Sequence, residues 1–241
     1  SLGEFGIILS LPLWLQNVLG YDALQTGFVL LALAIGSFDA SGFAGAFGNR
    51  VSPVTIVRVG LVAEIIGVAG LGFVISATAS WLAIVPFLFV YGFGVGLATA
   101  QLTGVVLKDI PVAASGQGSG TSSTARQIGS ALGIAILATN LFTSAGTALD
   151  ARLSNLPDAE RTQVVNAVVD SAGAAIPGLE KQDAAIAAAA RIAFSDATRF
   201  APFSAAGFLV LGFLATLRLS GVSRNREEEF AASAPSEGSL A

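Results

Sequence analysis

Three carboxylic acids lie inside long apolar segments of this 241-residue chain, namely Glu4, Asp39 and Glu64. An ionisable group in hydrocarbon costs at least ~2.5–3.5 kcal/mol on insertion scales, so each acid needs a reason to be there. Burial disfavours the charged form of a carboxyl, and a buried acid can therefore take up and release a proton near neutral pH. The three acids are our candidates for binding a proton or a substrate cation. The alternative for each is a protonated structural acid that bonds to a neighbouring helix.

The faces that carry two of these acids are rich in small residues. Asp39 precedes the loop at Arg50 by the same number of residues as Glu64 follows Pro53, so on two antiparallel helices both acids lie at similar depth. Small residues three or four positions away mark a face that packs against protein rather than lipid. We therefore expect both acids to point inward. Asp39 shares its helix stripe with Gly36, Gly42 and Ala46, and Glu64 shares its stripe with Gly60 and Gly67.

The elements that must position the acids are membrane-spanning helices. Hydrophobic residues make up 54% of the chain and charged residues 12%, where a soluble domain carries about 25% charged residues. A spanning helix needs roughly 20 apolar residues, and we predict five complete spans and a truncated first one. The chain has no Met, which predicts a fragment of a longer polypeptide. The predicted spans are residues 1–19 (truncated), 24–48, 54–77, 81–107, 123–147 and 200–219.

The segments outside the spans predict an orientation. Lys and Arg flank alternate loops, and the positive-inside rule then places those loops and the C-terminus in the cytoplasm of a multi-pass cell-membrane protein. Residues 148–199 form a predicted helical extracellular loop with a helix start at Pro157, a break at 176–178 and a helix from Asp183. We expect this loop to cover the outer face, with substrate recruitment as the alternative. The polar composition of residues 220–241 predicts a disordered cytoplasmic tail.

Composition excludes several kinds of chemistry. The chain contains neither Cys nor His, which excludes disulfides, a thiol nucleophile, an imidazole base and a His-ligated metal. The net charge of -4 argues against nucleic acid as a partner. The acids are scattered singly, so no catalytic constellation for a membrane enzyme is visible. We therefore expect no enzyme, no metal and no cofactor other than a proton gradient.

Polar residues near the span ends are further candidates. Arg126 and Gln127 begin the fifth span on the predicted cytoplasmic side. They could form a gate or a contact between domains. The favoured alternative is that Arg126 anchors the span by the positive-inside rule. Gln16, Asn17 and Gln101 could line a cavity, although a hydrogen bond between helices is the more common use of such residues.

Aromatic and glycine residues admit two interpretations each. Phe93 could stack on a lipophilic cation, as could Trp14, although Trp14 also fits an aromatic belt at the membrane interface together with Tyr21 and Trp81. The glycines of the run 92–96 resemble a dinucleotide fingerprint only superficially, because no strand precedes them. We expect them to serve helix packing.

Two stretches carry a resemblance to a known family. The stretch LPLWLQNVLGYDALQTG (11–27) and the more specific TARQIGSALG (124–133) resemble the major facilitator superfamily, most closely its fourteen-span drug:proton antiporters. The resemblance implies an all-α membrane protein, a major-facilitator-type six-helix half bundle that forms the carboxy-terminal half. The loop 45–54 departs from the family's G-x-x-x-D-R-x-G-R-[RK] pattern and keeps only Gly45 and Arg50. Arg50 is our candidate for a gating residue in this cytoplasmic loop.

The resemblance also implies a function and partners. We expect proton-coupled antiport of lipophilic or cationic drugs or metabolites by alternating access, with a non-transporting scaffold or sensor as the alternative. The implied partners are a small-molecule substrate, the lipid bilayer and a missing amino-terminal half of the same polypeptide. The helix of Glu4 corresponds to one that lines the central cavity and that of Glu64 to a peripheral one, so the candidates rank Glu4, Asp39, Glu64.

Overall fold

The computed structural model describes residues 2–47, 51–107, 110–111 and 114–233, and within these ranges the chain forms helices and no strand. The helices are α1 (Leu2–Asn17), α2 (Ala23–Phe47), α3 (Pro53–Val74), α4 (Trp81–Leu107), α5 (Ser115–Arg152), α6 (Asp158–Asp170), α7 (Ile176–Leu179) and α8 (Ala184–Ser233).

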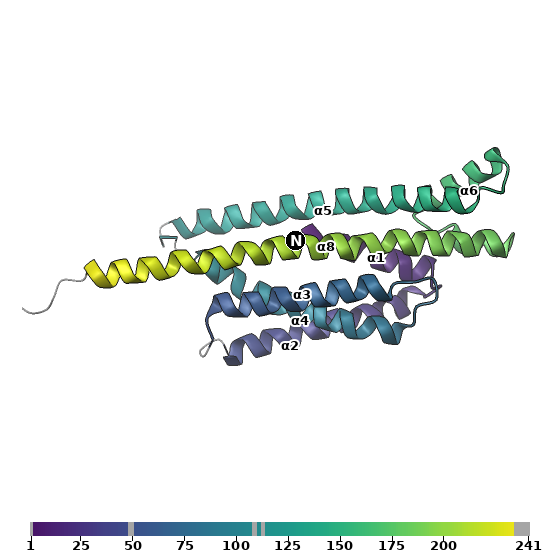
Figure 1. The fold of residues 1–241 in the computed structure, drawn as a ribbon. Coiled ribbons are helices and arrows are strands. Elements are labelled where there is room, and N and C mark those ends of the chain that lie inside the picture. The colour runs from purple at the N-terminus through teal and green to yellow at the C-terminus, as the bar shows by residue number, and fades with distance from the viewer. Residues whose placement is uncertain (1, 48–50, 108–109, 112–113, 234–241) are drawn as a thin grey trace, which may run out of the picture.

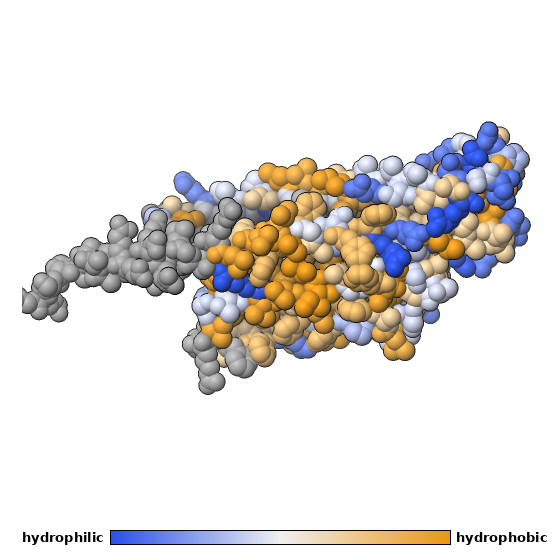
Figure 2. Space-filling view, viewed as in Figure 1, coloured by the Kyte–Doolittle hydropathy of each residue, from blue (hydrophilic) through white to orange (hydrophobic). Residues whose placement is uncertain are grey.

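The bundle is a membrane protein. In the described part of the chain five helices, α2, α3, α4, α5 and α8, are long and apolar enough to cross a bilayer, and α1 contributes a shorter apolar helix from Ile7 to Asn17. Figure 2 shows hydrophobic residues over the middle of the bundle and hydrophilic residues gathered at the end that carries α6. The prediction of an all-α membrane protein is confirmed.

The helices form two groups that meet along α3 and α8 (Figure 1). In the first group α4 packs against both α2 and α3. In the second group α5 and α8 pack together, and α1 lies against both of them. The long helices α5 and α8 reach beyond α2, α3 and α4 at the end where α6 lies (Figure 1). The joint between the groups is the place where α1, α3, α4, α5 and α8 all come near one another.

Glycines on α4 allow close approach of its two neighbours. A Cβ atom placed on Gly92 would overlap the carbonyl oxygen of Leu33 on α2. A Cβ atom placed on Gly94 would lie 2.5 Å from the backbone nitrogen of Glu64 on α3. The glycines of 92–96 therefore face α2 and α3 alternately, and the prediction that they serve helix packing is confirmed.

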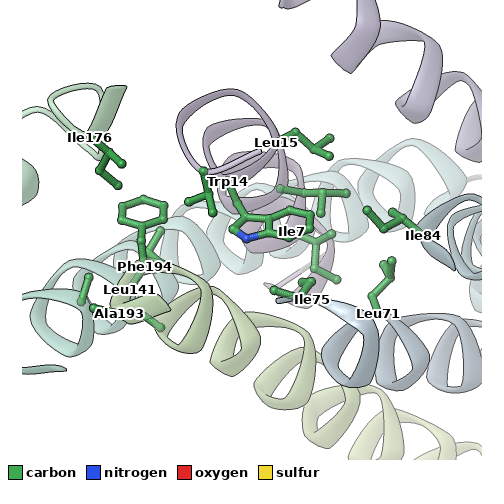
Figure 3. Close-up of a cluster of buried hydrophobic side chains, with 14 of the residues drawn as sticks. Ile7, Trp14, Leu15, Leu71, Ile75, Ile84, Leu141, Ile176, Ala193 and Phe194 are labelled. Atoms are coloured by element: carbon green, nitrogen blue, oxygen red, sulfur yellow. The ribbon is translucent and has the colours of Figure 1, made fainter. Parts of the chain in front are cut away.

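The core joins α1 to α8 through a buried indole. Trp14 is fully buried, and its Nε1 donates a hydrogen bond of 3.0 Å to Ser195 Oγ on α8. Figure 3 shows Trp14 between Phe194 of α8 and Ile75 at the end of α3. The prediction of an interfacial belt is therefore wrong for Trp14, because its polar atom finds a partner in the protein rather than in the headgroup region.

Removing the acceptor for this indole should destabilise the bundle. Ser195→Ala leaves the buried Trp14 N–H without a partner, which costs about 1–3 kcal/mol of folding free energy. Thermal unfolding of the purified protein in detergent measures the loss. The control is Ser41→Ala, because Ser41 is exposed and bonds only to the Ser37 carbonyl of its own helix. Equal melting temperatures for both variants would show that the indole bond contributes nothing to stability.

The long helices differ from the predicted segment boundaries. The predicted helix start near Pro157 is confirmed by α6, which begins at Asp158. The predicted break at 176–178 is itself a single helical turn, α7, and the turn before it holds Ala172 and Gly173 at positive φ. The predicted loop helix from Asp183 is confirmed as the beginning of α8.

Helix α8 does not end where the last predicted span ends. It continues to Ser233, so the predicted disordered tail from residue 220 is wrong over 220–233, and residues 234–241 lie outside the described ranges. The Glu and Ala residues of 227–232 are strong helix formers, and they extend the turn that the span has already nucleated. Helix α5 likewise extends beyond 123–147 at both ends.

Arginines hold together the end of the bundle where α6 lies. Arg161 pairs with Asp150 at 2.8 Å and joins α6 to α5, and Arg152 pairs with Asp196 at 2.7 Å and joins α5 to α8. Arg199 on α8 donates hydrogen bonds to the carbonyl oxygens of Gly72 and Phe73 at the end of α3. These contacts fix α5, α6 and α8 on the end of α3; that this end is extracellular stays a prediction.

Candidate functional site

A cavity of about 350 Å³ lies at the joint of the two helix groups, with walls from α1, α3, α4, α5 and α8. Most of its lining is aliphatic or aromatic, as expected for the interior of a membrane bundle. The polar residues that line it are Glu4, Glu64, Tyr91, Thr99 and Arg126. The cavity therefore brings two of the three predicted acids together with one predicted gating residue.

Glu64 is the most enclosed acid of the cavity. Its residue is only 8% exposed, and its backbone nitrogen and Cγ lie against Gly94 of α4. Gly60 and Gly67, one turn to either side on α3, contact the α4 backbone equally closely. The prediction that the small-residue face turns Glu64 inward is confirmed. We ranked Glu64 third, yet α3 presents it to the cavity rather than to the periphery.

Glu4 and Arg126 complete the charged part of the lining. Glu4 lies half-buried in the first turn of α1, and Arg126 lies on α5 with much of its surface exposed. Two carboxyls face one guanidinium, so the cavity carries a net charge of about -1 when all three groups are ionised. Such a cavity favours a proton or a cation as its guest.

Tyr91, whose ring the sequence marks only as a possible contact for a lipophilic cation, also lines this cavity. It is 1% exposed, and its hydroxyl oxygen is buried with no hydrogen-bond partner among the described residues. Its backbone lies against Gly67, one turn from Glu64 along α3.

Asp39 lies apart from this cavity. It is exposed on α2, and the prediction that it points inward is wrong in this chain. Helix α4 packs on the stripe of Gly36, Ala40 and Ala44, whereas Gly42 faces open space. Small residues recur on two adjacent faces of α2, and Asp39 is on the face that α4 does not cover. Its predicted role in proton coupling stays untested, and its exposed position outside the cavity makes Asp39 a weaker candidate than Glu64.

The remaining polar candidates do not line this cavity. Asn17 donates a hydrogen bond of 3.0 Å to the Ala172 carbonyl oxygen and so holds the turn before α7 on α1. Gln16 and Gln127 are exposed, and Gln101 is half-buried. Arg50 lies outside the described residues.

Phe93 belongs to an aromatic cluster that does not line the cavity of Glu4 and Glu64. Its ring centre lies 6.0 Å from that of Phe43 and 6.4 Å from that of Phe89. The cluster sits between α2 and α4, beside the small core group that includes Leu97. Phe93 therefore packs against other rings, and the cation-stacking role stays a prediction.

Comparison with known proteins decides the family. Residues 1–134, more than half of the chain, match the Major Facilitator Superfamily. The chain belongs to this superfamily. The matched range contains Glu4, Glu64, Tyr91 and Arg126, and the superfamily resemblance seen in the sequence is confirmed.

Several members of the superfamily are similar to this chain. The Multidrug resistance protein B homolog of Mycobacterium tuberculosis (strain H37Rv) is 32% identical over 138 residues, which cover 57% of this chain and 26% of that protein. The Tetracycline resistance determinant of Streptomyces rimosus is 32% identical over 146 residues, 59% of this chain and 41% of the relative. The Multidrug resistance protein Stp of M. tuberculosis is 28% identical over 222 residues, 89% of this chain and 41% of the relative. The chain thus spans less than half the length of these relatives.

Proposed function

We propose that this chain is the carboxy-terminal six-helix half of a fourteen-span drug:proton antiporter that expels lipophilic, often cationic compounds. The observation that carries the proposal is the cavity that places Glu4 and Glu64 together inside an apolar bundle. The names of the relatives, which include multidrug and tetracycline resistance, support drug efflux. They also favour a transporter over a membrane enzyme. The missing amino-terminal half would supply the opposite wall of the transport pathway.

The proposed mechanism couples the flux of protons to the flux of substrate cations through the carboxyls of Glu4 and Glu64. A carboxyl in the cavity binds either a proton or a substrate cation, and the competition between them exchanges one for the other. Two six-helix halves rock about the site, so that it faces each side of the membrane in turn. The close α3–α4 contact at Gly60, Gly67 and Gly94 keeps the Glu64 wall rigid during this motion.

Transport by the full-length protein in proteoliposomes tests the proposal. With a proton gradient across the membrane, we expect the protein to move a fluorescent lipophilic cation such as ethidium against its concentration gradient. Adding ethidium to the purified protein should release protons. Transport that survives a protonophore would contradict proton coupling. If the protein showed no transport and released no protons, the result would favour the alternative of a non-transporting scaffold or sensor.

A further inference from the structure

Arg126 differs from the other arginines whose side chains the structure describes. Each of the others bonds to a carboxylate or to a backbone carbonyl oxygen of another segment. Among the described residues, the Arg126 guanidinium has no such hydrogen bond and no ion pair, and Arg126 lines the cavity of Glu4 and Glu64 instead. Its charge is therefore left to act on the cavity. The other arginines are Arg58, Arg152, Arg161, Arg191 and Arg199.

The charges that border the cavity come from three helices. Glu4 on α1 and Glu64 on α3 supply two carboxyls, and Arg126 on α5 supplies one guanidinium. The lining residues of α4 and α8 carry no group that is ionised at neutral pH. A sphere with the cavity's volume of about 350 Å³ would be about 9 Å across, close to the ~8 Å screening length at physiological ionic strength. All three charged groups therefore act on a guest in the cavity.

Arg126 sets the amount of positive charge that a guest must bring. Two ionised carboxyls alone would give the cavity a charge of about -2, and the guanidinium reduces this to about -1. A monovalent cation then neutralises the cavity, whereas a divalent cation leaves an uncompensated positive charge in apolar surroundings, which is costly. Arginine keeps its proton at any physiological pH, so its contribution stays constant while the carboxyls exchange protons.

We propose that Arg126 is a built-in counter-charge that makes the cavity select monovalent over divalent lipophilic cations. The guanidinium cancels one carboxylate, and the remaining negative charge binds either one proton or one monovalent cation. One positive charge leaves as another enters, so the exchange is electrically neutral. The part of this inference that concerns transport rests on the proposed function, whereas the charge selection is a property of binding alone.

Binding of ethidium and propidium to the purified full-length protein tests the selection. The two dyes share a phenanthridinium ring system, but ethidium carries one positive charge and propidium carries two. Fluorescence titration in a neutral detergent at mildly alkaline pH measures both affinities without competition from protons. We expect the unsubstituted protein to bind ethidium about tenfold more tightly than propidium, or better, which is the effect of one unfavourable charge interaction.

Variants of Arg126 connect this preference to its charge. Arg126→Gln should lower the ratio of the two affinities about tenfold, because the cavity then carries the charge of two carboxylates. Arg126→Lys should keep the ratio, because lysine retains the positive charge. The double variant Arg126→Gln with Glu4→Gln loses one charge of each sign, and we expect it to recover the preference for ethidium. A purely structural arginine would not be rescued by removing a glutamate.

The outcomes separate this proposal from the proposed function. An unchanged ratio in Arg126→Gln would make Arg126 a positive-inside anchor and overturn the proposal, as would a double variant that fails to recover the preference. Equal binding of the two dyes by unsubstituted protein would also overturn it, and this measurement survives any folding defect of the variants. Charge selection in a protein that transports neither dye would support the proposal and count against antiport. Binding of neither dye would contradict both.

Discussion

Glu64→Gln in the full-length protein is expected to reduce proton-driven drug efflux to the level of empty vesicles while the bundle stays folded. Glutamine keeps the volume and hydrogen-bonding capacity of the acid but cannot exchange a proton, so only the coupling step is removed. Glu64 lies against the α4 backbone in the cavity, and a neutral amide fits that apolar setting at least as well as an acid does. Ethidium efflux driven by an imposed pH gradient measures the effect. Glu4→Gln is expected to act in the same direction.

Asp39→Asn is the matched control for this prediction. Asp39 lies as far along α2 from the loop between α2 and α3 as Glu64 lies along α3. It is nevertheless exposed and lines no part of the Glu64 cavity. We expect the variant to keep most of its efflux. The opposite pattern, with coupling lost in Asp39→Asn and kept in Glu64→Gln, would place the proton site on the exposed face of α2. It would also refute the assignment of the cavity.

Gly94→Ala is expected to destabilise the protein by about 1–3 kcal/mol, the usual cost of forcing an extra carbon into a packed core. The added carbon would meet the Glu64 backbone nitrogen at 2.5 Å and the Gly60 carbonyl oxygen at 2.6 Å. Both are backbone atoms, so α3 and α4 must separate to admit it. The melting temperature of the purified protein in detergent measures this loss.

Gly42→Ala is the control for the packing prediction. A Cβ at Gly42 meets no atom within 4 Å, and alanine favours helix over glycine by about 1 kcal/mol. We therefore expect Gly42→Ala to melt at the same temperature or higher. If the two variants lost equal stability, helix propensity or expression rather than the α3–α4 contact would explain the result.

Local pattern was enough to predict the helices and the inward face of Glu64. Long apolar runs leave helix as the only open option in a bilayer, because every backbone polar group must be paired within the segment. Gly60 and Gly67 flank Glu64 at one-turn spacing, and such a stripe has a direct physical meaning, namely close backbone approach. Boundaries were less predictable, since α8 continues through alanine-rich and glutamate-rich flanks that sustain a helix outside the apolar run.

Relations between distant segments were out of reach of the sequence. Asp39 has small neighbours as Glu64 does, and only the position of α4 decides which face of α2 is covered. Trp14 meets Ser195 across 181 positions, so its burial could not be foreseen from its place at the end of a span. Arg126 and Tyr91 reach the cavity because α5 and α4 both border the joint of the two helix groups. These pairings depend on tertiary packing, which no local spacing encodes.

The uninterrupted α8 is longer than any bilayer is thick. Its 50 residues correspond to about 75 Å at 1.5 Å per residue, whereas a membrane with its headgroups measures about 40–45 Å. Helix α8 must therefore extend beyond the membrane into water, and the Arg152–Asp196 pair ties it to α5 at one end. The protruding part of α8 offers a fusion partner or a conformation-selective antibody a rigid attachment point. A tilt imposed there would move the α8 residues that line the cavity of Glu64, some tens of ångströms along the same helix.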